Sequence, residues 1–389
     1  MSEMTRRCSY NESSLLYVML CIGSVTFKFP HRFKELSAMK KMIYFKPFLG
    51  VFLVSCLVML QPEASAADVH SLARIGRSLS SEEIVKLEKH LETDVSDLNA
   101  RVKLLGYYSG KHIRSSEIRK IRQQHLLWLI EHAPESEVLG SPYGSLSHHG
   151  DGEAYYQAKR ILLAKIRDEP DNLALLKNGS KFFTLNDRSQ SIEFLQKGES
   201  LDKANPFWPK NIGQAHLLNT QGESSLKQQR IEAANALAAF QRAHEISTEM
   251  GKGSILVSLA KSAFIANELD LASEYSKELI KGGGAGWNSG NRIHYGNIFL
   301  GRVALLRDDI DSAKAHLISA GKTTGSPQLN SFGPDMTLAR ELLKVDENGV
   351  VLEYFELCRK FWLHHRDKLD DWKVLVEGGR VPDFGRGYF

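Results

Sequence analysis

Apolar residues recur three and four positions apart along nearly the whole chain after residue 67, which is the spacing of one face of an α-helix. Three helices are expected first, opening near Ser80, Ser96-Asp97 and Ser116, because serine and aspartate cap helix starts. The third should stop near Pro134. The sequence shows no sustained alternation of the strand type, so it predicts an all-α protein. The apolar faces of the three helices are Ile84, Leu87 and Leu91; Val102, Leu105 and Tyr108; and Ile118, Ile121, Leu126, Leu129 and Ile130.

Small and large residues alternate in a way that predicts antiparallel helix pairs. The clearest unit has Leu300-Gly301 on a first helix, Asp308-Asp309 in a turn, and a small–large–small set on a second helix. Small residues allow two helices to approach closely, while the leucines fill the space between neighbouring pairs. The second-helix sets are Ala313, Leu317 and Ala320; Ala236, Phe240 and Ala243; and a poorer one at Ser191, Leu195 and Gly198. Leu259-Ala260, Asn267-Glu268 and Ala272 mark a further unit.

These units resemble the tetratricopeptide repeat. The spacing from Gly179 to Gly213 equals the length of one such repeat, about 34 residues. The resemblance covers most of the chain after residue 66; it is specific in 294–321 and degenerate elsewhere. It implies an α-solenoid of antiparallel helix pairs with several degenerate repeats, whose stacked first helices line an extended concave surface. The alternative is an irregular helical bundle with the same pair packing.

Changes in composition divide the chain further. Two insertions rich in small or polar residues, 219–230 and 281–290, interrupt the repeats, and 324–336 is expected to be a loop. The expected regions are an over-extended start or disordered segment at 1–38, a signal peptide at 39–66, degenerate helical pairs and a loop at 67–153, tetratricopeptide-like repeats at 154–323, a loop and last helix pair at 324–366, and a C-terminal tail at 367–389.

The segment 39–66 has the three parts of a secretory signal. Two lysines precede an apolar run from Phe48 to Leu60, and Ala64-Ser65-Ala66 provides small residues before a cleavage point. The run is shorter than the roughly 20 residues of a membrane-spanning helix. We therefore expect cleavage after Ala66 and an exported protein, periplasmic or secreted, whose mature chain does not span the membrane. The alternatives are an uncleaved N-terminal anchor and a lipid anchor at Cys56, since Leu53-Val54-Ser55-Cys56 resembles a bacterial lipobox.

The net charge of +4 comes from the segment 1–66, which holds eight basic and four acidic side chains and leaves 42 of each sign in the rest of the chain. A neutral body does not fit a nucleic-acid binder that works by neutralising phosphates. Cys358 is the single cysteine after residue 66, so the mature chain has no internal disulfide and no cysteine-based zinc site. Cys358 is expected to be buried and inert because it lies on an apolar helical face.

Two stretches contain groups that could carry chemistry. His148-His149-Gly150-Asp151-Gly152-Glu153 gathers potential metal ligands, but their spacing matches no closed site and the run lies in an expected loop, 140–152. Gly321-Lys322-Thr323 resembles the end of a phosphate-binding loop, yet His316 stands where the motif needs glycine, and a helix precedes it. The sequence therefore predicts no metal, no cofactor and no catalytic residue.

The expected function is that of an exported scaffold that binds a protein or peptide partner in its concave groove, without catalysis. The resemblance implies that first-helix side chains contact the partner. Lys261 and Arg302 hold the same position in successive units, which favours an acidic or C-terminal-carboxylate ligand. The alternatives are a cell-envelope enzyme, which would need an added domain or a buried acid in the groove, and a lipoprotein assembly factor on a helical superhelix. The predicted contact residues are Lys210, Gln214, Lys261, Tyr295 and Arg302.

Overall fold

The computed structural model describes residues 67–111, 113, 115–223, 225–282 and 288–385. They form helices joined by short connections, and this part of the chain contains no β-strand, which confirms the all-α prediction. The expected signal peptide and Cys56 lie outside the described residues. The helices are α2 (Ala67–Ser78), α3 (Ser81–Thr93), α4 (Leu98–Tyr108), α5 (Ser116–His132), η1 (Glu137–Gly140), η2 (Pro142–Gly144), α6 (His148–Asp168), α7 (Leu173–Phe183), α8 (Arg188–Leu201), α9 (Phe207–Asn219), α10 (Leu226–Ile246), α11 (Glu249–Ala266), α12 (Leu269–Lys281), α13 (Ser289–Leu306), α14 (Ile310–Gly321), α15 (Pro327–Phe332), α16 (Thr337–Leu343), α17 (Asn348–Cys358), η3 (Leu363–His365) and α18 (Arg366–Glu377).

Local capping explains where the N-terminal helices begin. Ser80 and Glu83 form a reciprocal capping box at the start of α3, and the Asp97 side chain accepts a hydrogen bond from the backbone N–H of Ala100 at the start of α4. Ser115 caps α5 in the same way. All three predicted helices are therefore confirmed to within a residue or two.

The first described helix, α2, was not expected as a separate element, and two glycines fix its position against α4. A Cβ atom on Gly76 would lie 1.9 Å from the backbone oxygen of Lys103, and one on Gly106 would lie 2.0 Å from that of Ala73. No side chain fits at either position. The two helices therefore cross with their backbones in direct contact.

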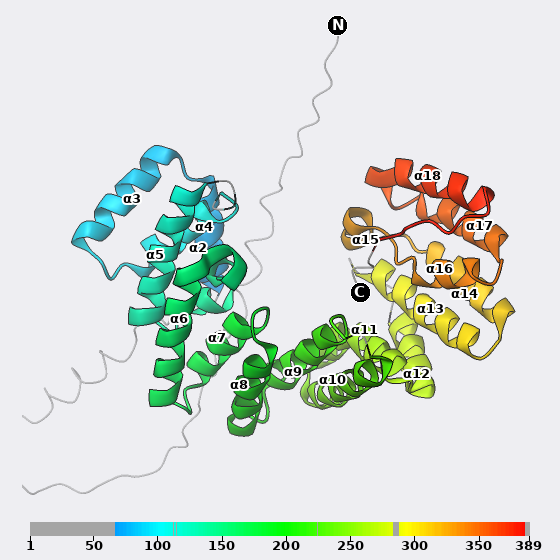
Figure 1. Cartoon of the computed structure of the whole chain (residues 1–389), viewed down its shortest axis with the longest axis horizontal. Helices are drawn as coiled ribbons and strands as arrows, with labels where there is room; N and C mark the ends of the chain where they lie inside the picture. Colours follow the sequence, from blue (N-terminus) through cyan, green and yellow to red (C-terminus); the bar gives the residue numbers. More distant parts are fainter. Residues whose placement is uncertain (1–66, 112, 114, 224, 283–287, 386–389) are drawn as a thin grey trace, which may run out of the picture. The chain divides into compact units, whose positions relative to one another are not determined.

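Eight helices between residues 173 and 321 pack as adjacent pairs: α7 with α8, α9 with α10, α11 with α12, and α13 with α14. The second helix of each pair also contacts the first helix of the next, so consecutive helices lie side by side along the chain (Figure 1). This arrangement agrees with the pairs expected from the sequence. After α14 the pairing continues with α16 and α17, and α14 packs against α17.

The small–large–small sets lie on the buried faces of the second helices. Every member of the predicted sets is buried, because these residues face both their own first helix and the next pair. The pattern extends into α17, where the sequence analysis did not assign it. The buried sets are Ser191, Leu195 and Gly198; Ala236, Phe240 and Ala243; Ala313, Leu317 and Ala320; and Val351, Phe355 and Cys358. Helix α12 instead buries Ala272, Ser276 and Leu279, in the order small–small–large.

Glycines on the first helices make room for large side chains of their partners. A Cβ atom on Gly179 would lie 3.1 Å from the Phe194 ring, and one on Gly213 would lie 2.9 Å from the Phe240 ring. These two glycines, one repeat length apart in the sequence, therefore hold equivalent places in successive pairs, each against an aromatic residue of its second helix.

The same turn joins the two helices in three successive pairs. Asn267, Asp308 and Asp346 have positive φ angles of 69°, 59° and 61°, and each directly precedes the N-cap of the following helix. Asparagine and aspartate tolerate this left-handed conformation better than most residues, which explains their recurrence here. The spacing from each of these turns to the next is longer than a tetratricopeptide unit of about 34 residues.

Four expected non-helical stretches contain helices. The predicted insertion at 219–230 is partly helical because α10 already begins at Leu226, and α15 lies within the predicted loop at 324–336. Residues 148–152, assigned to a loop, form the first turn of α6, which is kinked at Gly152 with a φ of 49°. The predicted tail at 367–389 is wrong for its first part, because α18 runs to Glu377 and buries Leu369, Trp372 and Val376.

The buried apolar residues of the described chain fall into four clusters rather than one core. One joins α3 and α4, a second runs from α2 to α9 and reaches α10, a third spans α9 to α13, and a fourth spans α13 to α18. Each cluster is built by helices that are close in sequence, as expected when helix pairs are added one after another.

Candidate partner-binding groove

The five predicted contact residues lie on the first helices α9, α11 and α13. Lys210 and Gln214 are exposed on α9, and Lys261 is half-buried on α11. Tyr295 and Arg302 lie on α13, where Tyr295 is only 3% exposed. The exposed α9 positions follow from packing: the neighbouring Ile212 and Gly213 are buried, so Lys210 and Gln214 face away from α10.

A hollow of about 330 Å³ opens between α9, α11 and α13 and is closed on one side by Gln328 of α15. Gln214, Lys261 and Tyr295 all line it. Lys210 stands at its rim, because its Nζ donates a 3.4 Å hydrogen bond to the Oγ of Ser254, another lining residue. The structure thus brings four of the five predicted residues to one place.

Two other hollows along the first helices share lining residues with this one. One lies between α9 and α11 and shares Ser254 with the first hollow. The other lies between α7, α9 and the segment 139–146 and shares Gln214 with the first hollow. The latter two share Lys181 and Asn211. We call these three adjoining hollows the first-helix groove. Its lining residues include lysines, side-chain amides and serines, but no aspartate or glutamate.

Lys261 carries a charge that is poorly solvated. Burial lowers the pKa of its ammonium group, the nearby Asp335 carboxylate opposes this effect, and Arg302 adds to it. Within the described residues, Lys261 makes no hydrogen bond and no ion pair. A cation that is half-buried, open to a hollow and without a partner is a place where an anion would bind.

Tyr295 forms a wall between the groove and a separate hollow, which Phe332, Asp335 and Trp362 help to line. Burial, and then the charge of Asp335, raise the pKa of the Tyr295 phenol far above its usual value, so the hydroxyl stays neutral. Because so little of its surface is exposed, Tyr295 shapes the groove more than it offers contact area.

Arg302 lies outside the groove lining and has a carboxylate partner. Its Nε and Nη2 donate hydrogen bonds of 2.7–3.0 Å to both oxygens of Glu341 on α16, and its guanidinium lies 4.1 Å from the centre of the Phe264 ring. The guanidinium N–H groups that could bind a ligand carboxylate bidentately are therefore already bound to Glu341. Arg302 therefore joins α13 to α16, and it does not stand beside Lys261 as a second open cation.

The sequence analysis missed two lysines of the α7 end of the groove. Lys181 lines two of its hollows, and Lys177 lies one helical turn away on the same face. Their ammonium groups lie 5.2 and 5.4 Å from the centre of the Phe207 ring. Their spacing of one helical turn was a visible signal, but the register that aligns Gly179 with Gly213 places Ser180, and not Lys181, at the position of Gln214.

The metal-ligand run at 148–153 is held by local hydrogen bonds. The Nδ1 of His148 lies 3.1 Å from the side-chain oxygen of Asn186, while Asp151 accepts hydrogen bonds from the backbone N–H of Ser147 and from Gln123. Gly321 ends α14, and the Thr323 hydroxyl donates to the backbone oxygen of Gly290, so no strand-loop-helix phosphate site is formed there.

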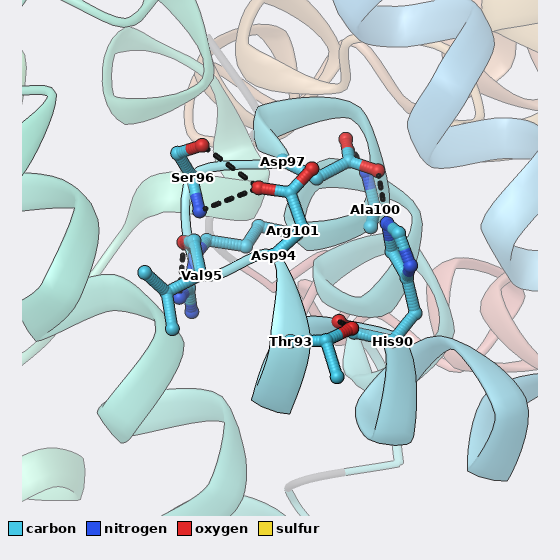
Figure 2. Close-up of polar contacts among 8 residues, drawn as sticks. All are labelled: His90, Thr93, Asp94, Val95, Ser96, Asp97, Ala100 and Arg101. Carbon is cyan, nitrogen blue, oxygen red and sulfur yellow. Dashed lines mark hydrogen bonds and ion pairs between the residues drawn. The ribbon is translucent and has the colours of Figure 1, made fainter.

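One other group of three potential metal ligands occurs in the described residues: His90, Asp94 and Asp97, with ligand atoms within 4.8 Å of one another. Figure 2 shows that local bonds account for it. Asp94 accepts hydrogen bonds from the N–H and hydroxyl of Ser96, and Asp97 caps α4 and contacts the His90 ring at 3.1 Å. The geometry is that of a tight turn between α3 and α4.

Comparison of the chain with protein-family models and with curated proteins finds no match in either. Among the described residues, no helix combines the length and the apolar character needed to cross a membrane.

Proposed function

We propose that this protein is an exported scaffold of the tetratricopeptide-like solenoid type, and that it binds a protein or peptide partner along the first-helix groove. The observation that carries the proposal is the meeting of Gln214, Lys261 and Tyr295, which lie on three different helices, around one hollow. Residues far apart in sequence that line one concave surface are the usual basis of recognition in repeat proteins.

Unsatisfied polar groups in the groove support binding. The side-chain amides of Gln214 and Gln221 are exposed, line the hollow and make no hydrogen bond within the described residues. Each amide offers both donors and an acceptor, which suits the N–H and C=O groups of a peptide backbone.

We also propose that the groove acts without catalysis. The enzyme alternative needed a buried acid there, and the lining residues include none. General acid–base chemistry on a glycan would require a pair of such groups. The nearest buried carboxylate on the far side of Tyr295, Asp335, is occupied by the N–H and hydroxyl of Thr337.

Site-specific photo-crosslinking of the full chain in the cells that produce it tests the proposal. A benzophenone amino acid at Gln214 should yield a defined crosslinked partner. The matched control places it at Gln196, an equally exposed glutamine on the second helix α8. Crosslinks of equal yield and identity at both positions, or none at Gln214, would reject the groove as the binding surface.

A further inference from the structure

Lysines occupy the first-helix groove on three successive first helices. Lys181 lies on α7, Lys210 on α9 and Lys261 on α11, and Lys177 lies one turn from Lys181 without lining a hollow. The three that line or border the hollows face no acidic lining residue. This local excess of one sign contrasts with the balanced charge of the chain after residue 66, and it marks the groove electrostatically.

None of these four lysines forms an ion pair with an acid of the described residues, whereas some lysines and arginines elsewhere do. Several lysines and arginines on or beside the second helices form ion pairs with acids of neighbouring elements. The pairs are Lys159 with Asp187, Lys197 with Asp171, Arg242 with Glu199, Arg307 with Asp270, and Lys314 with Glu347. No such pair within the described part of the chain neutralises the charges of the four lysines on the first helices.

The groove lysines also act on one another. Burial lowers the pKa of Lys181, and the charges of Lys177 and Lys210 lower it further. The charge of Asp335 raises the pKa of Lys261, and the charge of Arg302 lowers it. An anionic ligand would relieve both the repulsion among the lysines and the unbalanced charge of Lys261.

The polar surroundings favour a peptide over other polyanions. Gln214, Gln221 and Ser258 line the hollow with groups that make no hydrogen bond in the described residues, and these suit backbone amides. The bases of single-stranded nucleic acids stack on open aromatic rings. Tyr295 is buried, and the half-buried ring of Phe207 lies beneath Lys177 and Lys181.

We propose that the first-helix groove binds an extended acidic segment of a protein partner, whose carboxylates lie against Lys181, Lys210 and Lys261. This inference rests on the proposed function and names the chemistry of the partner. It replaces the Lys261 and Arg302 pair expected from the sequence by a row that continues toward α7 rather than toward α16, because Arg302 is paired with Glu341.

Fluorescence anisotropy of the full chain tests this with two labelled peptides, one alternating Glu with Gly and one in which Gln replaces every Glu. The Glu peptide should bind at least about tenfold more tightly, and less tightly in high salt. Replacing Lys181, Lys210 and Lys261 together by Gln should weaken its binding about tenfold. The matched control replaces Lys159, Lys197 and Lys314 by Gln, which removes the same charge from paired positions and should leave binding within about twofold.

Equal losses in the two triple variants would overturn the inference, because the effect would then be one of bulk charge. Equal binding of the Glu and Gln peptides, or stronger competition by a polyuronate oligosaccharide or an oligonucleotide than by the Glu peptide, would overturn it as well. The two proposals can fail separately. If a partner still crosslinks at Gln214 and keeps its affinity for the lysine variant, the groove remains the binding surface and the acidic segment is rejected. Circular dichroism verifies that both triple variants are folded.

Discussion

The Nε2 atom of His294 accepts a 2.9 Å hydrogen bond from the backbone N–H of Asp335. The other ring nitrogen lies 3.1 Å from the backbone oxygen of Ala320, so a neutral ring donates its Nδ1 proton there. His294 is 0% exposed and directly precedes Tyr295. One imidazole therefore connects α13 to the end of α14 and to the turn before α16, and it holds the wall of the groove.

This contact predicts a loss of stability in mild acid. Burial lowers the pKa of His294 below its ordinary value of 6.5, although the charge of Asp335 opposes the shift. As the pH falls through about 6.5, the His294 imidazole takes up a proton in the unfolded chain but stays neutral in the folded chain, so the free energy of unfolding decreases. The melting temperature should drop between about pH 7 and pH 5.

His294→Gln should lower the melting temperature at neutral pH and flatten this slope. His316, whose pKa is also lowered by burial, provides the matched control. His316→Gln should leave in place the part of the pH dependence of the melting temperature that comes from His294. Thermal melts at several pH values measure both. An unchanged slope in His294→Gln would contradict the assignment.

Gly301→Leu should destabilise the α13–α14 pair. A Cβ atom at Gly301 would lie 2.3 Å from a methyl carbon of Leu338 and 3.1 Å from the Cβ of His316, so a leucine overpacks the crossing and costs about 1–3 kcal/mol. Denaturant unfolding measures this change. Gly349→Ala is the control, since its Cβ would meet no atom within 4 Å, and it should be neutral or stabilising by up to about 1 kcal/mol. A Gly301→Leu variant as stable as wild type would mean that these helices do not cross as described.

Arg302→Ala should act on stability more than on binding. The side chains of Arg302 and Glu341 are 21% and 31% exposed, and we expect a coupling energy of about 1 kcal/mol in a double-mutant cycle. Partner affinity should fall more for Lys261→Ala than for Arg302→Ala, with the larger difference at low salt. If Arg302→Ala weakens binding as much as Lys261→Ala while the fold is unchanged, Arg302 belongs to the binding surface after all.

The signal-peptide hypothesis predicts the N-terminus of the exported protein. Residues 39–66 lie outside the described structure, and the expected cleavage point follows Ala64-Ser65-Ala66. N-terminal sequencing should therefore begin at Ala67 or within a residue or two of it. A chain that begins at a lipid-modified Cys56 would establish the anchored alternative, and an uncleaved chain would contradict export by cleavage.

Local signals made the helices and their pairing predictable. The Ser80 cap, the Asp308-Asp309 turn and the set Ala313, Leu317 and Ala320 each act within one turn or one pair, so their meaning can be read from spacing alone. α18 was not predicted although Leu369, Trp372 and Val376 have helical spacing, because Gly378 and Gly379 indicate where a helix ends and not where it begins.

The chemistry of the groove was less predictable because it depends on contacts between units. Arg302 and Glu341 are far apart in sequence, and only the packing of α13 against α16 makes them partners. Tyr295 was expected to offer contact area, but only 3% of it is exposed. Equivalent positions in a repeat share their backbone geometry, whereas their exposure depends on neighbours that differ from unit to unit.

The division of buried residues into four clusters has a mechanical consequence. Because each cluster is formed by helices that are near in sequence, the loss of one leaves the others with their own packed surfaces. A load applied between the two ends of the chain would be taken up cluster by cluster, in a series of separate yielding steps.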